Sequence, residues 1–349
     1  MSYSTSQGTS NDESQGISYS TSERYTQNRS RSAENLCGSG HYQNLTQSSS
    51  SGHSSSSRPL VSVIIPAYQC ADTICQAIDS ALAQEEIPLE IVVISDDSPD
   101  DLESAMSRYK NVRQVRYCKN KHSLGAAASR NRGVKMAKGR YVAFLDADDW
   151  WEKDKLKKQL RLLEPDGAFL DSIDPDGTAS KGSARNYDAS KGADTNDTSM
   201  IEDRPVLCAT ARELVTPEGE LTGRVIPVHE SISYRRLLLH NCINCSSVVI
   251  RTDVARKFPM THEDSHEDYI TWLRILKKYG NAAAVNEPLL KYRLSSSGKS
   301  GSKLQSAKKT YRAYRYAGFG AASSAGLFCL YAVNGVIKYA RAFMGGRKQ

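Results

Sequence analysis

The first fifty-odd residues lack any apolar run and consist mainly of Ser, Thr, Gln and Gly. A secretory signal needs such a run, so we expect the protein to stay in the cytosol. The chain also lacks a cysteine framework, because its eight cysteines are scattered over 349 residues. A chain of this length buries a core without cross-links, so no set of structural disulfides is expected.

The C-terminal part lacks acidic residues, since none follows Glu287 whereas twelve Lys and Arg residues do. The net charge of the whole chain is +7, so the remainder carries −5. A basic tail on a mildly acidic body indicates an anionic partner, either a membrane surface or a nucleic acid. No groove-reading motif accompanies the charge, so we expect no nucleic-acid partner.

Two segments have too little apolar content to offset the entropy of ordering. We expect residues 1–57 to be a disordered Ser-rich tail and residues 165–203 to be a flexible acidic insertion. The insertion divides one globular domain, 58–298, into halves at about 58–163 and 204–298. Residues 299–349 are predicted to form a basic and apolar helical extension.

Strand-like and helix-like patterns alternate in the first half of the domain. Strands are predicted at 61–65, 91–94, near 112–117 and at 141–145, with helices at 72–83, around 102–109, near 126–137 and at 151–163. This alternation predicts an α/β fold with a Rossmann-like, mostly parallel sheet and flanking helices. In such sheets ligands bind beyond the carboxyl ends of the strands.

Carboxylates follow two of the predicted strands directly. Asp96 comes after the second strand, and Asp146, Asp148 and Asp149 come after the fourth. Acids this close repel one another unless a cation lies among them, and carboxylate oxygens suit Mg²⁺ or Mn²⁺. A second interpretation stays open, in which the acids form a solvated loop and Asp149 caps the next helix.

Five motifs follow one another along the chain: VSVIIPAY at 61–68, EIVVISDDS at 90–98, ASRNRG at 128–133, GRYVAFLDADD at 139–149 and HEDYITWLR at 266–274. Together they resemble family-2 glycosyltransferases of the GT-A fold, of the type that builds bacterial cell-surface polysaccharides. The resemblance covers about 60–299 apart from the insertion. One departure is Ser95, which stands where most members carry the first of two paired acids.

The resemblance implies a pocket for a nucleotide sugar, with a UDP-sugar favoured. Pro66, Ala67 and Tyr68 would line the nucleoside pocket, and Asp96 would accept hydrogen bonds from the base.

The resemblance also implies a site for the donor diphosphate with a bound Mn²⁺ or Mg²⁺. Arg130 and Asn131 would donate hydrogen bonds to the diphosphate or the sugar. Asp148 would contact the ribose and the metal, and Asp146 or Asp149 would complete the metal site.

On the acceptor side, the resemblance implies that Asp268 is the general base that takes the proton of the acceptor hydroxyl. Glu267, Trp272 and Arg274 would lie near the acceptor. A structural alternative remains for Asp268, because an acid is also favoured at the start of a helix.

The chemistry agrees with these roles. Displacing a nucleoside diphosphate needs a cation to neutralise the leaving group and a base beside the incoming hydroxyl. A single in-line displacement inverts the anomeric centre. We therefore hypothesise an inverting, metal-dependent transferase that moves a hexosyl or N-acetylhexosaminyl group to a polyprenyl-diphosphate-linked saccharide.

The tail contains a basic amphipathic pattern at 303–316 and an uncharged stretch at 319–337. Nineteen uncharged residues could just span a bilayer, but Ser, Asn and Gly interrupt them. We favour attachment in the membrane interface over packing on the protein or spanning. The protein would then lie on the inner face of the cytoplasmic membrane, bound to its anionic surface.

Two other functions fit parts of the sequence. A nucleotidyltransferase also uses a Rossmann-like half with acidic metal ligands, but it needs a Gly-rich basic loop after the first strand, where residues 66–69 read PAYQ. A non-catalytic nucleotide-sugar-binding scaffold is the alternative from a different class. The presence of Asp146, Asp148 and Asp268 argues against it.

Overall fold

The structure is a computed structural model, and it describes residues 59–164, 204–294 and 303–345. The predicted tail at 1–57, the predicted insertion at 165–203 and the first residues of the C-terminal extension lie outside these ranges.

The first half alternates strands and helices as predicted. Its elements are β1 (Val61–Ala67), α2 (Ile74–Leu82), β2 (Leu89–Ser95), α3 (Leu102–Ser107), β3 (Val115–Lys119), α4 (Ala126–Met136) and β4 (Tyr141–Phe144). Each predicted strand and helix is confirmed, with ends shifted by a few residues.

After β4 the strands and helices alternate less regularly. The further elements are β5 (Trp150–Trp151), α5 (Lys155–Leu163), β6 (Leu207–Val215), β7 (Leu221–Ile226), β8 (Ser231–Ile232), α6 (Tyr234–Leu239), β9 (Val249–Arg251), α7 (Thr252–Lys257), α8 (Glu267–Tyr279), β10 (Ala282–Arg293), α9 (Lys303–Tyr316) and α10 (Ala321–Gly345). A helix starting at residue 151 was expected. It starts at Lys155 because Trp150 and Trp151 pair with β10.

The strands of the described residues form one sheet in the order β3-β2-β1-β4-β9-β6-β10-β5, with β7 beside β6 and β8 beside β10. The four strands β3, β2, β1 and β4 are parallel. Their carboxyl ends therefore lie at one edge, which brings the segments after β1, β2 and β4 together. Antiparallel β9 joins this parallel half to β6, which runs parallel to β10.

Each face of the sheet is covered by helices, because successive side chains of a strand point to opposite faces. Val63 and Ile65 of β1 pack in the core that contains α2, α3 and α5. Ile64, between them, packs in the core that contains α4, α6, α7, α8 and α9. Helices on both faces explain why the inner strands β1, β2 and β4 are largely apolar, whereas the edge strand β3 is only partly buried and carries Arg116 and Lys119.

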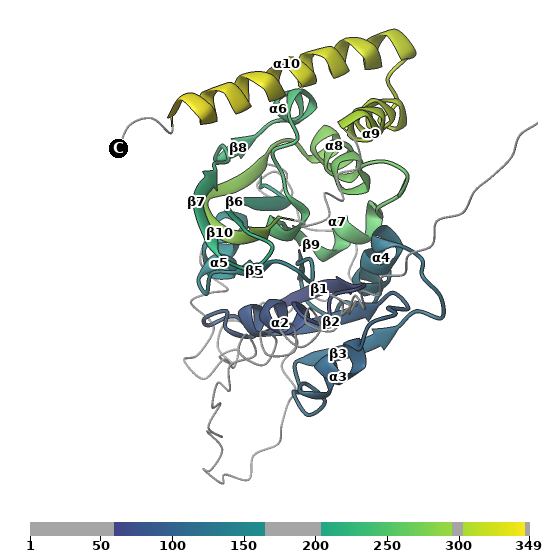
Figure 1. The fold of residues 1–349 in the computed structure, drawn as a ribbon, viewed down its shortest axis with the longest axis vertical. Coiled ribbons are helices and arrows are strands. Elements are labelled where there is room, and N and C mark those ends of the chain that lie inside the picture. The colour runs from purple at the N-terminus through teal and green to yellow at the C-terminus, as the bar shows by residue number, and fades with distance from the viewer. Residues whose placement is uncertain (1–58, 165–203, 295–302, 346–349) are drawn as a thin grey trace, which may run out of the picture. The chain divides into compact units, whose positions relative to one another are not determined.

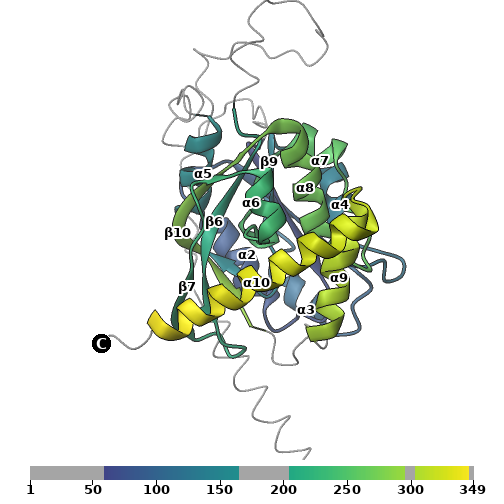
Figure 2. The same ribbon diagram turned by 90° about the horizontal axis from the view of Figure 1, so that it is seen from above.

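The C-terminal extension packs on the domain through α9. Ala313 and Tyr314 of α9 are fully buried, and the Tyr314 hydroxyl donates to the carbonyl of Leu238 at 2.5 Å. Helix α10 contacts α6 and α9 and is the long helix crossing α6 in Figures 1 and 2. Among the described residues, no helix is both long and apolar enough to cross a membrane.

A glycine sets how closely α4 approaches β1. A Cβ built on Gly133 would lie 2.3 Å from Cγ2 of Ile64. We expect Gly133→Ala to lower the free energy of unfolding by about 1–3 kcal/mol, because the overlap outweighs the better helix propensity of Ala. Denaturant unfolding measures this. The control is Gly326→Ala in α10, where a Cβ meets nothing within 4 Å; equal effects at both sites would contradict the packing argument.

Candidate active site

The acidic loop after β4, residues 145–149, is held by hydrogen bonds to two distant segments of the chain. The backbone N–H of Asp146 donates to the Ser246 hydroxyl at 3.1 Å. The backbone N–H of Arg293, at the end of β10, donates to Oδ1 of Asp149 at 2.9 Å, and its Nε donates to the carbonyl of Asp148 at 2.9 Å. Segments 100 to 145 residues away therefore fix the shape of this loop.

Arg293 ties the acidic loop to two further segments. Its two terminal nitrogens donate to the carbonyl of Pro217 at 3.0 Å and to the side chain of Gln76 at 2.6 Å. Its guanidinium also lies 5.2 Å from the ring centre of Trp150. Sequence reasoning missed Arg293, because only the pairing of β10 in the sheet brings it to this edge.

The three acids of the loop differ in accessibility. Asp148 is exposed and the Asp146 side chain is 29% exposed, whereas Asp149 is 1% exposed. Burial raises the pKa of Asp149 well above its usual value, and the charges of Asp148 and Asp146 raise it further. Because Asp149 is covered in this structure, Asp148 and Asp146 are the acids of this loop that lie open to a cation and a substrate phosphate; the metal role of Asp149 stays a prediction.

The exposed acids fit a divalent cation that also binds phosphate. No group of three or more His, Cys, Asp or Glu side chains in the described ranges could hold a metal by itself. Mg²⁺ and Mn²⁺ sites at phosphates need only one or two carboxylates, because phosphate oxygens and water complete the coordination. Asp148 and Asp146 meet that requirement, and like-charge repulsion among the loop acids favours a cation there.

Arg130 of α4 joins the acidic loop to the start of α8. Its terminal nitrogens donate to Asp146 at 2.6 Å and to Glu267 at 3.0 Å, and the residue is 6% exposed. Burial opposes its charge, but Asp146 and Glu267 raise the pKa of Arg130 well above its usual value. Arg130 thus positions two acids, in place of the predicted hydrogen bond to the diphosphate.

Asp268 lies at the start of α8, next to the acid that Arg130 holds. Burial raises the pKa of Asp268 to about 6, and the charge of Glu267 raises it as well, whereas Arg130 acts in the opposite direction. Its Oδ1 accepts the backbone N–H of Tyr269 at 2.7 Å. The side chain is only partly buried. A carboxylate with this pKa is well suited to accept a proton near neutral pH.

The carboxylate of Asp96, after β2, accepts five hydrogen bonds from residues between β3 and the first turn of α4. Burial alone would raise its pKa, but the hydrogen bonds that it accepts hold the pKa of Asp96 below its usual value. The donors are the side chains of Asn120, Ser123 and Ser129 and the backbone N–H groups of Leu124 and Gly125. Its contact with the base stays a prediction, since five protein donors already surround this carboxylate.

The end of β1 offers an exposed aromatic ring at the same edge. Ala67 is buried and its carbonyl accepts the backbone N–H of Asp96 at 2.9 Å, which fixes the two strand ends side by side. Pro66 is partly buried, and Tyr68 is 46% exposed. Of these three, Tyr68 presents the surface on which a base could stack.

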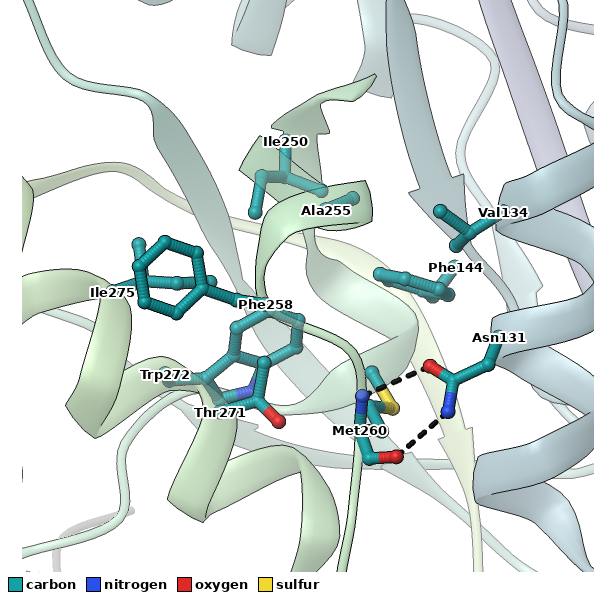
Figure 3. A pocket seen from close by; sticks show the side chains of 10 residues that line it. All are labelled: Asn131, Val134, Phe144, Ile250, Ala255, Phe258, Met260, Thr271, Trp272 and Ile275. Carbon is teal, nitrogen blue, oxygen red and sulfur yellow. Dashed lines mark hydrogen bonds between the residues drawn. The ribbon is translucent and has the colours of Figure 1, made fainter. Parts of the chain in front are cut away.

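Asn131 and Trp272 lie away from this edge, in the interior shown in Figure 3. The Asn131 side chain donates to the carbonyl of Met260 at 2.7 Å and accepts its N–H at 2.9 Å. This pairing gives Asn131 a structural role in place of the predicted donor contact. The predicted acceptor contact of Trp272 is wrong, because the residue is 1% exposed and its ring packs near Phe144.

The cavity in Figure 3 is not a substrate site. Its volume is about 10 Å³, enough for a single water molecule. Arg274, also predicted near the acceptor, lies two turns along α8 from Glu267, and its guanidinium is 5.5 Å from the ring centre of Phe258. Of the three predicted acceptor-side residues, only Glu267 lies beside Asp268.

Glu263 was not predicted as a site residue. It belongs to the loop before α8, and its side chain contacts the start of α4. Its carboxylate accepts the backbone N–H of Ala127 at 3.3 Å. Burial raises the pKa of Glu263, and the Ala127 N–H lowers it in part. Gly125 is needed beside it, since a Cβ there would lie 1.8 Å from the carboxylate and the backbone has φ of 89°. This contact brings the loop before α8 onto the donor half of the domain.

Comparison with known sequences identifies related proteins. The profile described as glycosyl transferase family 2 matches residues 62–210. The putative teichuronic acid biosynthesis glycosyltransferase TuaG of Bacillus subtilis is 30% identical over 259 residues, covering 74% of this chain and 88% of TuaG. WfaP of Escherichia coli, a UDP-Glc:alpha-D-GlcNAc-diphosphoundecaprenol beta-1,3-glucosyltransferase, is 30% identical over 290 residues, covering 82% and 98%.

Two solved structures share the fold. TarS 1-349 of S. aureus in complex with UDP-GlcNAc has a TM-score of 0.50 at 17% identity and covers 78% of this chain and 71% of that one. The mannosyltransferase PcManGT of Pyrobaculum calidifontis, in complex with GDP-Man and Mn²⁺, has a TM-score of 0.50 at 15% identity and covers 82% and 76%. At these identities the likeness concerns the fold alone, and it confirms the predicted GT-A architecture.

The Arg130 bridge can be tested without a substrate. Arg130→Gln leaves Asp146 and Glu267 partly buried without their cation, so we expect the free energy of unfolding to fall by about 3–5 kcal/mol. The pKa of Asp268, followed by carboxyl NMR, should rise because Arg130 holds it down. Arg113→Gln removes the same charge from an exposed site and is the control. Equal stability of the two variants would show that the bridge is unimportant.

Proposed function

Because the chain belongs to glycosyltransferase family 2, we propose that it moves a sugar from a nucleotide-sugar donor to a lipid-linked saccharide in cell-surface polysaccharide synthesis. The observation that carries the proposal is the Arg130 bridge, which joins Asp146, on the candidate metal loop, to Glu267, the residue before the candidate general base Asp268. A transferase needs both, one at the leaving group and one at the incoming hydroxyl.

The donor is assigned to the edge formed by the ends of β1, β2 and β4. Tyr68 flanks the base, and Pro66 and Ala67 form the floor of the nucleoside pocket. A UDP-sugar is favoured, since WfaP takes UDP-Glc according to its name. The segment between β3 and α4, which Asp96 organises through five hydrogen bonds together with the first turn of α4, borders the same pocket.

The donor diphosphate is assigned to the loop after β4 together with Mn²⁺ or Mg²⁺. Asp148 and Asp146 would hold the ion, which neutralises the charge of the departing nucleoside diphosphate. Asp149 supports the loop from beneath through its hydrogen bond with the backbone of Arg293. Arg130 keeps Asp146 in place through their ion pair.

Asp268 is assigned as the general base. It removes the proton of the acceptor hydroxyl as that oxygen attacks the anomeric carbon, from the side opposite to the diphosphate. One displacement of this kind inverts the configuration. The beta linkage in the name of WfaP agrees with an inverting reaction at an alpha-linked UDP-sugar.

The acceptor is assigned as a saccharide on a polyprenyl diphosphate, by analogy with the diphosphoundecaprenol acceptor in the name of WfaP. Such a lipid lies in a membrane, so the enzyme must work at its surface. We propose peripheral attachment to the inner face of the cytoplasmic membrane through α9 and α10. The cations of α9 and the exposed Leu330 and Val333 of α10 support this assignment.

The direct test of the function is a panel of nucleotide sugars, offered with Mn²⁺ and isolated membranes, with release of nucleoside diphosphate as the readout. Asp268→Asn should bind the donor with unchanged affinity, while transfer falls by about 10²–10⁴-fold because the base is lost. Asp253→Asn, on the exposed surface of α7, is the control. Tight donor binding by wild type without any turnover would favour the non-catalytic scaffold.

The pKa of Asp268 predicts how the rate depends on pH. The base must be ionised, so the rate of transfer should rise with pH and level off above about 6. The lower rate in acid cannot come from loss of stability through Asp268. A raised folded-state pKa stabilises the folded protein below pH 4, and this contribution to the free energy of unfolding is lost as the pH rises through 6. A rate that stays constant from pH 5 to 8 would contradict the assignment of Asp268.

The metal assignment predicts a difference between two exposed acids of the same edge. Asp148→Asn should raise the Mn²⁺ concentration for half-maximal activity by about tenfold or more, since one ligand charge is lost. Asp97→Asn changes a similar exposed acid after β2, where φ of 55° suits Asn, and should leave that concentration unchanged. Equal Mn²⁺ dependence in the two variants would remove Asp148 from the metal site.

A further inference from the structure

The candidate active site is rich in negative charge, which poses a problem for an acceptor that carries its own diphosphate. Five acids belong to the candidate site: Asp146 and Asp148 on the loop after β4, Glu263 on the loop before α8, and Glu267 and Asp268 at the start of α8. Arg130 neutralises part of this charge and the donor's cation another part. A second diphosphate near Asp268 would be repelled unless further cations lie beside it.

Helix α9 provides such cations on one side only. Lys308, Lys309, Arg312 and Arg315 are all exposed, and α9 contains no acidic residue. At 3.6 residues per turn these four side chains project within an arc of about 120°. Thr310, Ala313 and Tyr314 lie outside that arc and are buried. We refer to the four exposed cations as the α9 stripe.

Helix α9 is fastened to the loop that leads into Asp268. The Ser265 hydroxyl donates to the carbonyl of Lys309 at 2.8 Å. Arg312 pairs with Asp264 at 3.3 Å, and the Tyr316 hydroxyl donates to the same carboxylate at 3.0 Å. The ring of Tyr316 also stacks on His262, with centroids 3.7 Å apart and planes 9° apart, and both rings are exposed.

These contacts fix the stripe beside the proposed base. Asp264 is four residues before Asp268, so their Cα atoms are separated by at most about 14 Å. Lys309 lies against the same segment, because its carbonyl accepts the Ser265 hydroxyl, and its charge adds to burial in lowering the pKa of His266, two residues before Asp268. Lys308 and Lys309 have no ion pair among the described residues, so both ammonium groups remain available to a ligand.

We propose that the α9 stripe binds the diphosphate of the lipid-linked acceptor, at a site separate from that of the donor diphosphate. The acceptor sugar then lies over the stacked rings of His262 and Tyr316 and presents its hydroxyl to Asp268. Arg312 and the lysines contact the phosphates through charge-assisted hydrogen bonds. This inference rests on the proposed function and identifies which group of the acceptor α9 recognises.

Anionic lipid headgroups carry phosphate, like the acceptor diphosphate, and could bind the same cations. One experiment is therefore done without a membrane. Geranyl diphosphate, a prenyl diphosphate that stays in solution, is titrated into the full-length protein by calorimetry. EDTA is present to remove divalent cations, so that no cation at the acidic loop after β4 binds the diphosphate of the ligand. Lys308→Gln/Lys309→Gln should weaken binding by about tenfold, in line with the loss of charge-assisted contacts.

The matched control is Lys277→Gln/Lys278→Gln, which removes two exposed lysines near the end of α8, about 15 Å along the helix axis from Asp268. It should bind geranyl diphosphate like wild type. Unchanged binding by the α9 variant, or an equal loss in both variants, would overturn the proposal. The proposal also fails if the α9 variant loses affinity only for phosphatidylglycerol vesicles, because the stripe would then recognise headgroups.

A second arm separates this inference from the proposed function. With a polyprenyl-diphosphate saccharide in detergent, the α9 variant should show a KM for the acceptor raised by about tenfold and an unchanged KM for the donor. If wild type transfers no sugar while geranyl diphosphate binding still depends on the stripe, the function is wrong and the anion site stands. If transfer occurs with equal acceptor KM values, only the inference fails.

Discussion

The buried guanidinium of Arg130 is the contact on which the arrangement of this site depends. It lies between Asp146, on the loop after β4, and Glu267, at the start of α8, and it satisfies both carboxylates at hydrogen-bonding distance. Removing one partner of such a group leaves an uncompensated buried charge, which costs several kcal/mol. The two halves of the domain are therefore held in one relative position, and the acidic loop after β4 keeps a fixed separation from Asp268.

The distribution of charge explains why so many elements meet at one edge of the sheet. Both proposed substrates carry diphosphates, while the residues that catalyse transfer are acids. On the proposed assignment, the cations come from separate sources: Arg130 within the protein, a divalent ion at Asp148 and Asp146, and the α9 stripe. Because the stripe lies on α9, the proposed site is complete only when α9 is packed on the domain.

The fold was predictable in its first half because β1, β2 and β4 are buried and largely apolar, and because helical patterns separate the strands. The second half was harder for particular reasons. Strand β10 is interrupted by a register shift between Val285 and Leu290, so its pattern is broken. Trp150 and Trp151 follow an acid that resembles a helix cap, yet they pair with β10 before α5 begins. Both features depend on partners far along the chain.

The type of chemistry is readable from local sequence pattern: the acids after β2 and β4, the acid pair that opens α8, and the basic tail. Which of these side chains are exposed, and which partners they have, depends on how the chain folds. The fold buries Asp149 and Trp272, pairs Asn131 with Met260, makes Arg130 a bridge and packs Arg293 and α9 against the loops of the candidate site. The physical reason is that exposure and hydrogen-bond partners are mostly set by residues far along the chain, whereas helix propensity and apolar pattern are properties of neighbouring residues.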